Sequence, residues 1–238
     1  MWKSLNVASV VVALFLGMVP SSASGQVTTP PAPYANFRFN GNDKNSAKGD
    51  ATLELRNTQF KENAIYLNGK YDGAEKDGYR AVCKTPRIDY TKFTVAIRFK
   101  AEEFNPNMNN LITGGTSYRW FGMNRSQAGN LVITLNNQAF SHEIKDASLE
   151  AGKWTVVACA VDLSTRKVTA HVNGKIAAEI DLPSDFQLEV MNSTAKESDK
   201  AWTFSNYSNG SVFHGLVDRL LIYDRALGAG ELEKINLK

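Results

Sequence analysis

Short runs of alternating apolar and polar residues recur along most of this chain, with turn signals roughly every 8–12 residues between them. The clearest run, residues 93–100 (FTVAIRFK), has an apolar side chain at every second position on one face, which is typical of a half-buried β-strand. The dipeptide Asn173-Gly174 predicts a tight hairpin, because both residues tolerate positive φ angles. About twelve such strands and almost no helical periodicity predict an all-β fold, either a two-sheet sandwich or a barrel.

The segment 215–227 (GLVDRLLIYDRAL) departs from strict alternation at one point. Apolar residues stand at positions 217, 220 and 222, so one step is longer than the two-residue step of a plain strand. A β-bulge accounts for the longer step and would re-aim Asp218 and Arg219. After Asp224-Arg225 we expect the chain to turn into a short helical tail over residues 231–237.

Six segments, in order along the chain, resemble the laminin G-like, or concanavalin A-like lectin/glucanase, jelly-roll family. The last is similar to the family's closing run G-x-I-D-E-V-R-I-Y-N-R-A-L, which an acidic helical turn follows. The segments are 37–42 (FRFNGN), 65–69 (IYLNG), 93–100 (FTVAIRFK), 152–158 (GKWTVVA), 168–175 (VTAHVNGK) and 215–227. The resemblance implies an antiparallel two-sheet jelly-roll sandwich over residues 34–238 with a short C-terminal helical turn. It does not imply one activity, because this fold hosts lectins, adhesion modules and glycan hydrolases.

Residues 1–25 are expected to be a secretory signal peptide. Lys3 precedes an apolar run over 7–19, and small residues follow it (PSSASG, 20–25), so cleavage is expected after Ala23 or Gly25. The apolar run is short for a membrane span, although an uncleaved anchor is the alternative. Residues 26–33 (QVTTPPAP) predict a proline-rich linker. The mature chain is therefore expected to be secreted, to the extracellular space, the periplasm or the cell surface, without insertion in a membrane.

The charge of the chain is nearly balanced. The sequence has 27 lysines and arginines against 24 acidic residues, and loss of Lys3 with the signal leaves 26 basic residues. A net charge this small and this evenly spread argues against a nucleic-acid partner or an anionic membrane surface.

The two cysteines, Cys83 and Cys159, stand in strand-like segments far apart in the sequence. An exported chain meets oxidising conditions, so a disulfide between them is one expectation, and two buried free thiols are the other. Only their geometry can decide between the two. Two cysteines are too few for a thiolate zinc cluster.

Residues arranged for catalysis are hard to find in this sequence. Glycan hydrolases of the family carry paired carboxylates on one strand face, but Glu179-Ile180-Asp181 is followed by no third carboxylate at the required spacing. Glu102 and Glu103 are adjacent, so on a strand they would face opposite ways. The histidines His142, His171 and His214 stand singly, and we expect His171 to lie on the outer surface of a sheet. The alternative of a catalytic pair formed by carboxylates from two different strands stays open.

Four aromatic residues are candidates for a sugar-binding surface, because aromatic faces stack on pyranose rings. Tyr118 and Trp120 are two apart and would share a strand face, while Trp202 and Tyr207 flank a stretch rich in Asn and Ser. The alternative is that the two tryptophans are core residues, as most aromatics in a β-sandwich are.

A calcium ion is a further expectation, because related domains often hold one between loops. Asp43, Asn45 and Asp50 lie in the first polar loop, and Asp218 would approach them if the terminal strands are neighbours. The alternative is turn capping by these Asx side chains.

These observations predict an exported, non-catalytic binding module with a carbohydrate ligand, so its expected partner is a glycan. Two alternatives stay open: a protein-adhesion or structural module that contacts a cell-surface or extracellular protein, and a divergent glycan-cleaving hydrolase. The sequence does not set the oligomeric state.

Overall fold

The computed structural model describes residues 32–68, 80–85, 87–104, 106, 109–115, 120–136, 138–188, 200–204 and 213–235. The expected signal peptide and residues 26–31 of the expected linker lie outside these ranges, as do Tyr118 and Tyr207. No helix within the ranges has both the length and the apolar character that crossing a membrane requires.

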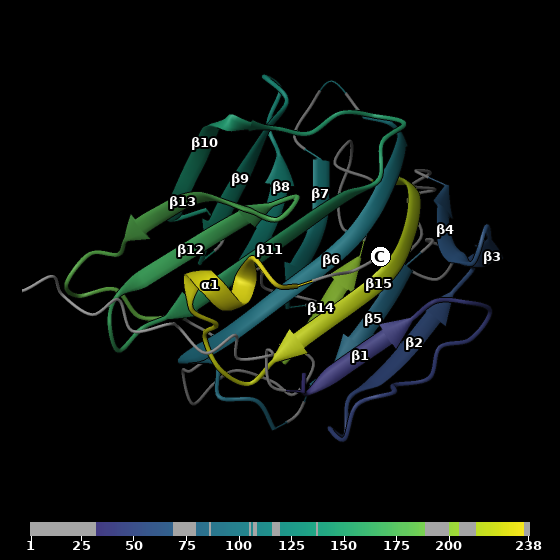
Figure 1. The fold of residues 1–238 in the computed structure, drawn as a ribbon, viewed down its shortest axis with the longest axis horizontal. Coiled ribbons are helices and arrows are strands. Elements are labelled where there is room, and N and C mark those ends of the chain that lie inside the picture. Colours follow the sequence, from purple (N-terminus) through teal and green to yellow (C-terminus); the bar gives the residue numbers. More distant parts are fainter. Residues whose placement is uncertain are drawn as a thin grey trace, which may run out of the picture.

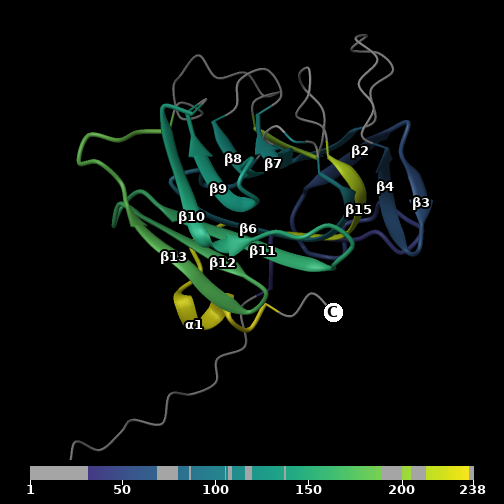
Figure 2. The ribbon, with the colours of Figure 1, turned by 90° about the horizontal axis from the view of Figure 1, so that it is seen from above.

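The fold consists of two antiparallel sheets packed face to face (Figures 1 and 2). Sheet A has the strand order β13-β12-β11-β6-β15-β4-β3, with β1 paired to β15, and sheet B has the order β10-β9-β8-β7-β14-β5-β2. The predicted all-β jelly-roll sandwich is therefore confirmed. The strands are β1 (Ala35–Arg38), β2 (Thr52–Arg56), β3 (Gln59–Lys61), β4 (Ala64–Asn68), β5 (Arg80–Lys84), β6 (Lys92–Glu103), β7 (Asn109–Gly114), β8 (Phe121–Arg125), β9 (Asn130–Leu135), β10 (Phe140–Ser148), β11 (Thr155–Asp162), β12 (Lys167–Val172), β13 (Lys175–Asp181), β14 (Ala201–Phe204) and β15 (His214–Tyr223).

The main core fills the space between the two sheets. On β6 the alternating residues Phe93, Val95, Ile97 and Phe99 point into it, as the period of two predicts. The expected hairpin is also present, because β12 and β13 join at Asn173-Gly174, where both residues have positive φ angles.

A second, smaller apolar cluster lies on the outer face of sheet A. There α1 (Ala229–Leu232) covers part of the sheet, on the side away from sheet B (Figure 2). The helix is shorter than the expected tail and starts two residues earlier, and its first turn is fixed by Glu231, which accepts a hydrogen bond from the Gly228 amide at 3.0 Å. The cluster contains Ala96, Ala158, Ala160, Leu221, Tyr223, Leu227, Leu232 and Ile235.

The predicted bulge in the closing strand is present. Val217 of β15 lies opposite Phe99 of β6, and Arg219 lies opposite Arg98, so Asp218 is an extra residue without a partner in this register. The bulge leaves both Asp218 and Arg219 partly exposed beside Arg98, outside the core. The irregular step in the sequence therefore places two charged side chains on the outer face of sheet A.

His171 on β12 lies outside the main core, as expected, but it is not exposed to solvent, so the expectation of a surface residue was wrong. It pairs with Ala158, a member of the helix-covered cluster, and is 0% exposed. Neither ring nitrogen has a hydrogen-bond partner of good geometry among the described residues. Burial lowers the pKa of His171 below its ordinary value of 6.5, and the nearby charge of Glu233 and the backbone of Gly174 partly oppose the shift.

This burial predicts that the protein loses stability as the pH falls below about 6.5. The unfolded chain then binds a proton that the folded chain resists, which costs up to about 1.4 kcal/mol per pH unit. We expect His171→Leu to remove this dependence and to raise the free energy of unfolding at pH 7 by about 1 kcal/mol. Urea unfolding at pH 7.5 and pH 5.0 measures both effects. The exposed His142 on β10 offers the control, since His142→Gln should keep the wild-type dependence. The prediction would be contradicted if His171→Leu lost as much free energy of unfolding between pH 7.5 and pH 5.0 as the wild type does.

Candidate ligand site

The two tryptophans expected to form a sugar-binding surface lie in the core. Trp120 and Trp202 are each 0% exposed, and their ring centroids are 4.9 Å apart. The indole nitrogen of Trp202 donates a hydrogen bond to the Thr85 hydroxyl at 3.0 Å, so even its polar atom is satisfied inside the protein. The surface hypothesis was wrong for both, and Tyr118 and Tyr207 lie outside the described residues.

The expected calcium ligands are engaged elsewhere or exposed. The side-chain oxygen of Asn45 accepts hydrogen bonds from the amides of Asn36 and Ala47, which is the turn-capping alternative. Asp218 contacts Arg98, and Asp43 is exposed. Among the described residues, no three His, Cys, Asp or Glu side chains form a group that could hold a metal. Calcium binding stays a prediction.

The disulfide expectation was wrong, and the free-thiol alternative describes Cys83 and Cys159. Cys83 is on β5 in sheet B, while Cys159 is on β11 in sheet A, and both thiols are buried and free. Burial raises the pKa of both thiols well above the ordinary value, so they behave as small core residues.

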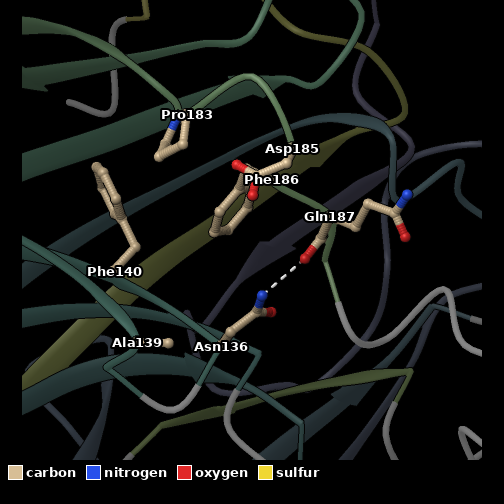
Figure 3. Close-up of a pocket in the computed structure, with 7 residues that line it drawn as sticks. All are labelled: Asn136, Ala139, Phe140, Pro183, Asp185, Phe186 and Gln187. Carbon is tan, nitrogen blue, oxygen red and sulfur yellow. Dashed lines mark hydrogen bonds between the residues drawn. The ribbon is translucent and has the colours of Figure 1, made fainter.

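A pocket of about 370 Å³ opens where the edge strands of the two sheets approach each other. One wall comes from the turn between β9 and β10, and the other from the segment that follows β13 (Figure 3). Phe140 and Phe186 meet with their ring centroids 6.0 Å apart and their planes inclined at 66°. The remaining lining residues are Asn136, Ala139, Pro183, Asp185 and Gln187.

Local hydrogen bonds hold both walls in place. Asn136, in the left-handed conformation at φ 49°, begins the turn that the Ala139 amide closes on the Asn136 carbonyl at 3.0 Å. The Asn136 side chain then reaches across the pocket and donates to the Gln187 carbonyl at 2.7 Å (Figure 3). On the second wall, the Phe186 amide donates to the Pro183 carbonyl at 3.1 Å. The two aromatic rings are thus presented by turns that are tied to each other.

The pocket combines half-buried aromatic rings with exposed polar groups. Asp185 and Gln187 lie beside the rings, and the pocket's lining contains one carboxylate and no basic side chain. The lining residues therefore suit the binding of a polar ring with an apolar face.

Few features of the sequence indicate this pocket. Residues 185–199 read as a polar loop, and Phe186 is a lone aromatic residue near its start. Phe140 begins a strand whose burial lacks a period of two. The only local signal is the pair of aromatics beside turn residues, and nothing in the pattern brings segments 136–140 and 183–187 together.

A separate titratable cluster lies at the end of β6. His214 contacts Glu103 through Nδ1 at 2.9 Å and Glu102 through Nε2 at 3.1 Å, and the Tyr66 hydroxyl lies 2.9 Å from the same Nε2. Glu102 and Glu103 thus do not separate to opposite faces, because the strand ends here and the β15 register shifts at His214. A hydrogen bond from Lys61 lowers the pKa of Glu102. This cluster is an ion network at the surface.

The family model of the concanavalin A-like lectin/glucanase superfamily matches residues 72–233. This chain belongs to that superfamily. The family resemblance is thereby confirmed, and four of the six sequence segments, from residue 93 onward, lie within the matched residues. The sandwich with its closing strand β15 is this superfamily's fold in the present chain. No curated protein sequence matches the chain.

Several solved structures share the superfamily fold at low sequence identity. The CBM40 domain of a Ruminococcus gnavus sialidase, bound to sialyllactose, has a TM-score of 0.50 at 18% identity, covering 60% of this chain and 81% of its own. Domain 4 of a Geobacillus stearothermophilus arabinanase, in complex with arabinotriose, has a TM-score of 0.58 at 17% identity, covering 85% of this chain and 97% of its own. A botulinum neurotoxin type C structure has a TM-score of 0.63 at 12% identity, covering 85% of this chain. The match spans 50% of the toxin chain.

Proposed function

We propose that this protein is an exported, non-catalytic carbohydrate-binding module that holds a sugar ring in the pocket between Phe140 and Phe186. The observation that carries the proposal is the pairing of two aromatic rings with an amide and a carboxylate in one open pocket. Ligand sites of this kind combine apolar and aromatic walls with a few well-placed polar groups.

A sugar ring has two kinds of surface, and the pocket has groups that match each of them. The C–H face of a pyranose ring is apolar and packs on an aromatic side chain, while its hydroxyls need hydrogen-bond partners when water is displaced. The Asp185 carboxylate accepts hydrogen bonds, and the Gln187 side chain can both accept and donate. The absence of a basic group from the pocket's lining favours a neutral sugar at this position.

Similar folds with sugar ligands support the proposal. The arabinanase domain is in complex with arabinotriose, the CBM40 domain is bound to sialyllactose, and the neurotoxin structure concerns interaction with two ganglioside molecules. These similarities concern the fold alone. The proposed sugar site rests on the pocket residues of this chain.

Phe186→Ala is expected to weaken glycan binding at least tenfold, which corresponds to about 1.4 kcal/mol of binding free energy. The substitution removes one aromatic wall of the pocket, at the margin of the core, and leaves the fully buried side chains in place. Affinity gel electrophoresis of the full chain against a panel of neutral polysaccharides identifies a ligand and measures the loss. The proposal fails if no polysaccharide retards the wild-type protein, or if Phe186→Ala binds as well as the wild type.

The matched control is Phe60→Ala. Phe60 is 43% exposed on β3, at the edge of sheet A opposite to β13, so it is the same substitution far from the pocket. Its affinity should equal that of the wild type. Release of reducing sugar from a retarding polysaccharide would contradict the non-catalytic part of the proposal.

A further inference from the structure

Three arginines form a row across neighbouring strands on the outer face of sheet A. Arg38 on β1 lies opposite Arg219 on β15, and Arg219 lies opposite Arg98 on β6. Residues directly opposite each other in antiparallel strands share a face, with Cβ atoms about 5 Å apart. The arginine row, Arg38-Arg219-Arg98, therefore brings three positive charges together on the part of this face next to the helix-covered cluster.

One carboxylate, that of Asp218, lies beside the three guanidinium groups of the row. Asp218 contacts Arg98, and the bulge places that carboxylate beside it. Within the described residues, Arg38 and Arg219 make no ion pair, and the Nε of Arg219 is buried without a hydrogen-bond partner. Burial and the charge of Arg38 lower the pKa of Arg219, and the charge of Asp218 partly opposes the shift. Like charges directly opposite each other destabilise a sheet, so a row of this kind carries a cost in the free protein.

An aromatic surface adjoins the row. The guanidinium carbon of Arg98 lies 4.4 Å from the centroid of the half-buried Trp154 ring, and the Lys100 nitrogen lies 5.5 Å from the same centroid. Lys100 is in turn paired with Glu62 at 2.9 Å. These contacts hold Arg98 and Trp154 in place, while the exposed side chain of Arg38 lies at the other end of the row.

We propose that the arginine row is a second ligand site, which binds the carboxylate or sulfate group of an acidic polysaccharide. A guanidinium group presents parallel N–H donors that match a planar carboxylate or a sulfate, and the exposed Arg38 beside the partly exposed Arg219 can supply such donors. Trp154 offers a ring face for the sugar that carries the group. That the anion is carried by a sugar rests on the proposed function, whereas the oxyanion site itself rests on the arginines.

The site is separate from the Phe140–Phe186 pocket. The pocket lies at the outer edges of the sheets, between the start of β10 and the segment that follows β13, whereas the row crosses β1, β15 and β6 within sheet A (Figure 1). The pocket's lining has no basic side chain, and the row has three. The two sites therefore differ in the ligand charge that they select.

Three polymers with one backbone test the proposal: dextran, carboxymethyl dextran and dextran sulfate, in affinity gels of the full chain at about 0.15 M salt. We expect the two anionic polymers to retard the wild type and plain dextran to retard it less. Arg219→Gln and Arg38→Gln should each weaken binding to an anionic polymer about fivefold to tenfold. Retardation by only one anionic polymer would support the site and identify its group as carboxylate or sulfate.

Arg87→Gln is the charge-matched control, because Arg87 is highly exposed and pairs with Asp50 away from the row. It should change the affinity less than about twofold. An equal loss in Arg87→Gln and Arg219→Gln would show attraction by net charge alone and overturn the proposal, as would failure of both anionic polymers to retard the wild type. Arg38→Gln alters an exposed side chain, so a loss of binding there does not reflect unfolding.

Failure of this site and failure of the pocket give different results. Phe186→Ala should leave binding to the anionic dextrans unchanged, and Arg219→Gln should leave binding to a neutral polysaccharide unchanged. If no neutral polysaccharide binds, the pocket proposal fails while retardation by anionic dextrans still supports the row.

Discussion

Trp202→Ala should lower the free energy of unfolding by about 3–5 kcal/mol, the usual cost of removing a large buried aromatic side chain. The indole lies between the two sheets, 4.9 Å from the Trp120 centroid and 5.4 Å from that of Phe93. Its truncation leaves a cavity walled by aromatic rings. It also removes the donor of a buried hydrogen bond to the Thr85 hydroxyl.

Urea denaturation followed by far-ultraviolet circular dichroism measures this loss. Trp202→Phe keeps most of the apolar contacts but not the hydrogen bond, so its cost should be about 1–3 kcal/mol. Phe60→Ala, at an exposed position, should stay within about 0.5 kcal/mol of the wild type. Equal stability of Trp202→Ala and the wild type would place the indole outside the core and restore the surface hypothesis.

The prediction that Trp202 lies on the surface was wrong for a physical reason that the sequence does not show. Trp202 and Phe204 stand at alternate positions of β14 and point into the core between the two sheets. Alternation predicts that the two residues share a face, but it does not say whether that face is the inner or the outer one. The neighbouring Asn- and Ser-rich stretch suggested a surface, but the strand itself is interior.

The fold was predictable because its signals are local. A period of two in β6, the Asn-Gly hairpin between β12 and β13 and the three-residue step at Asp218 each follow from a few consecutive residues. β10 was not expected, because its mostly exposed residues lack alternation. β3, which has three residues, and β7, whose six residues are all buried and so show no alternation, were also missed.

The two candidate sites were not predictable because they depend on strand order. The pocket joins residues near 140 and 186 only because β10 and β13 are edge strands of opposite sheets. The arginine row likewise joins residues 38, 98 and 219 through the pairing of the first strand with the last. The spacing of apolar residues placed Asp218 and Arg219 at a bulge, but it could not supply Arg38 and Arg98 as their neighbours.

Gly215, the second residue of the closing strand β15, lies too close to the neighbouring strand to carry a side chain. Gly215 has a φ of 150°, and the β15 register with β6 shifts between His214 and Gly215. A Cβ atom at this position would lie 2.2 Å from the carbonyl oxygen of Lys100 and 2.8 Å from the Cα of Ala101. Both are backbone atoms of the adjacent strand, so no side-chain rotation can relieve the contact.

Gly215→Ala is therefore expected to lower the free energy of unfolding by roughly 3 kcal/mol or more, from overpacking and from a backbone conformation that L-residues rarely adopt. Gly174→Ala separates the two causes, because Gly174 also has a positive φ, 83°, but nothing lies within 4 Å of the added Cβ. Its cost should be about 1 kcal/mol, the conformational part alone. Urea denaturation of both variants gives the difference, which measures the steric contact between β15 and β6. Equal costs for the two would mean that β6 yields to the added methyl group and that the close approach at Gly215 does not fix the register of the closing strand.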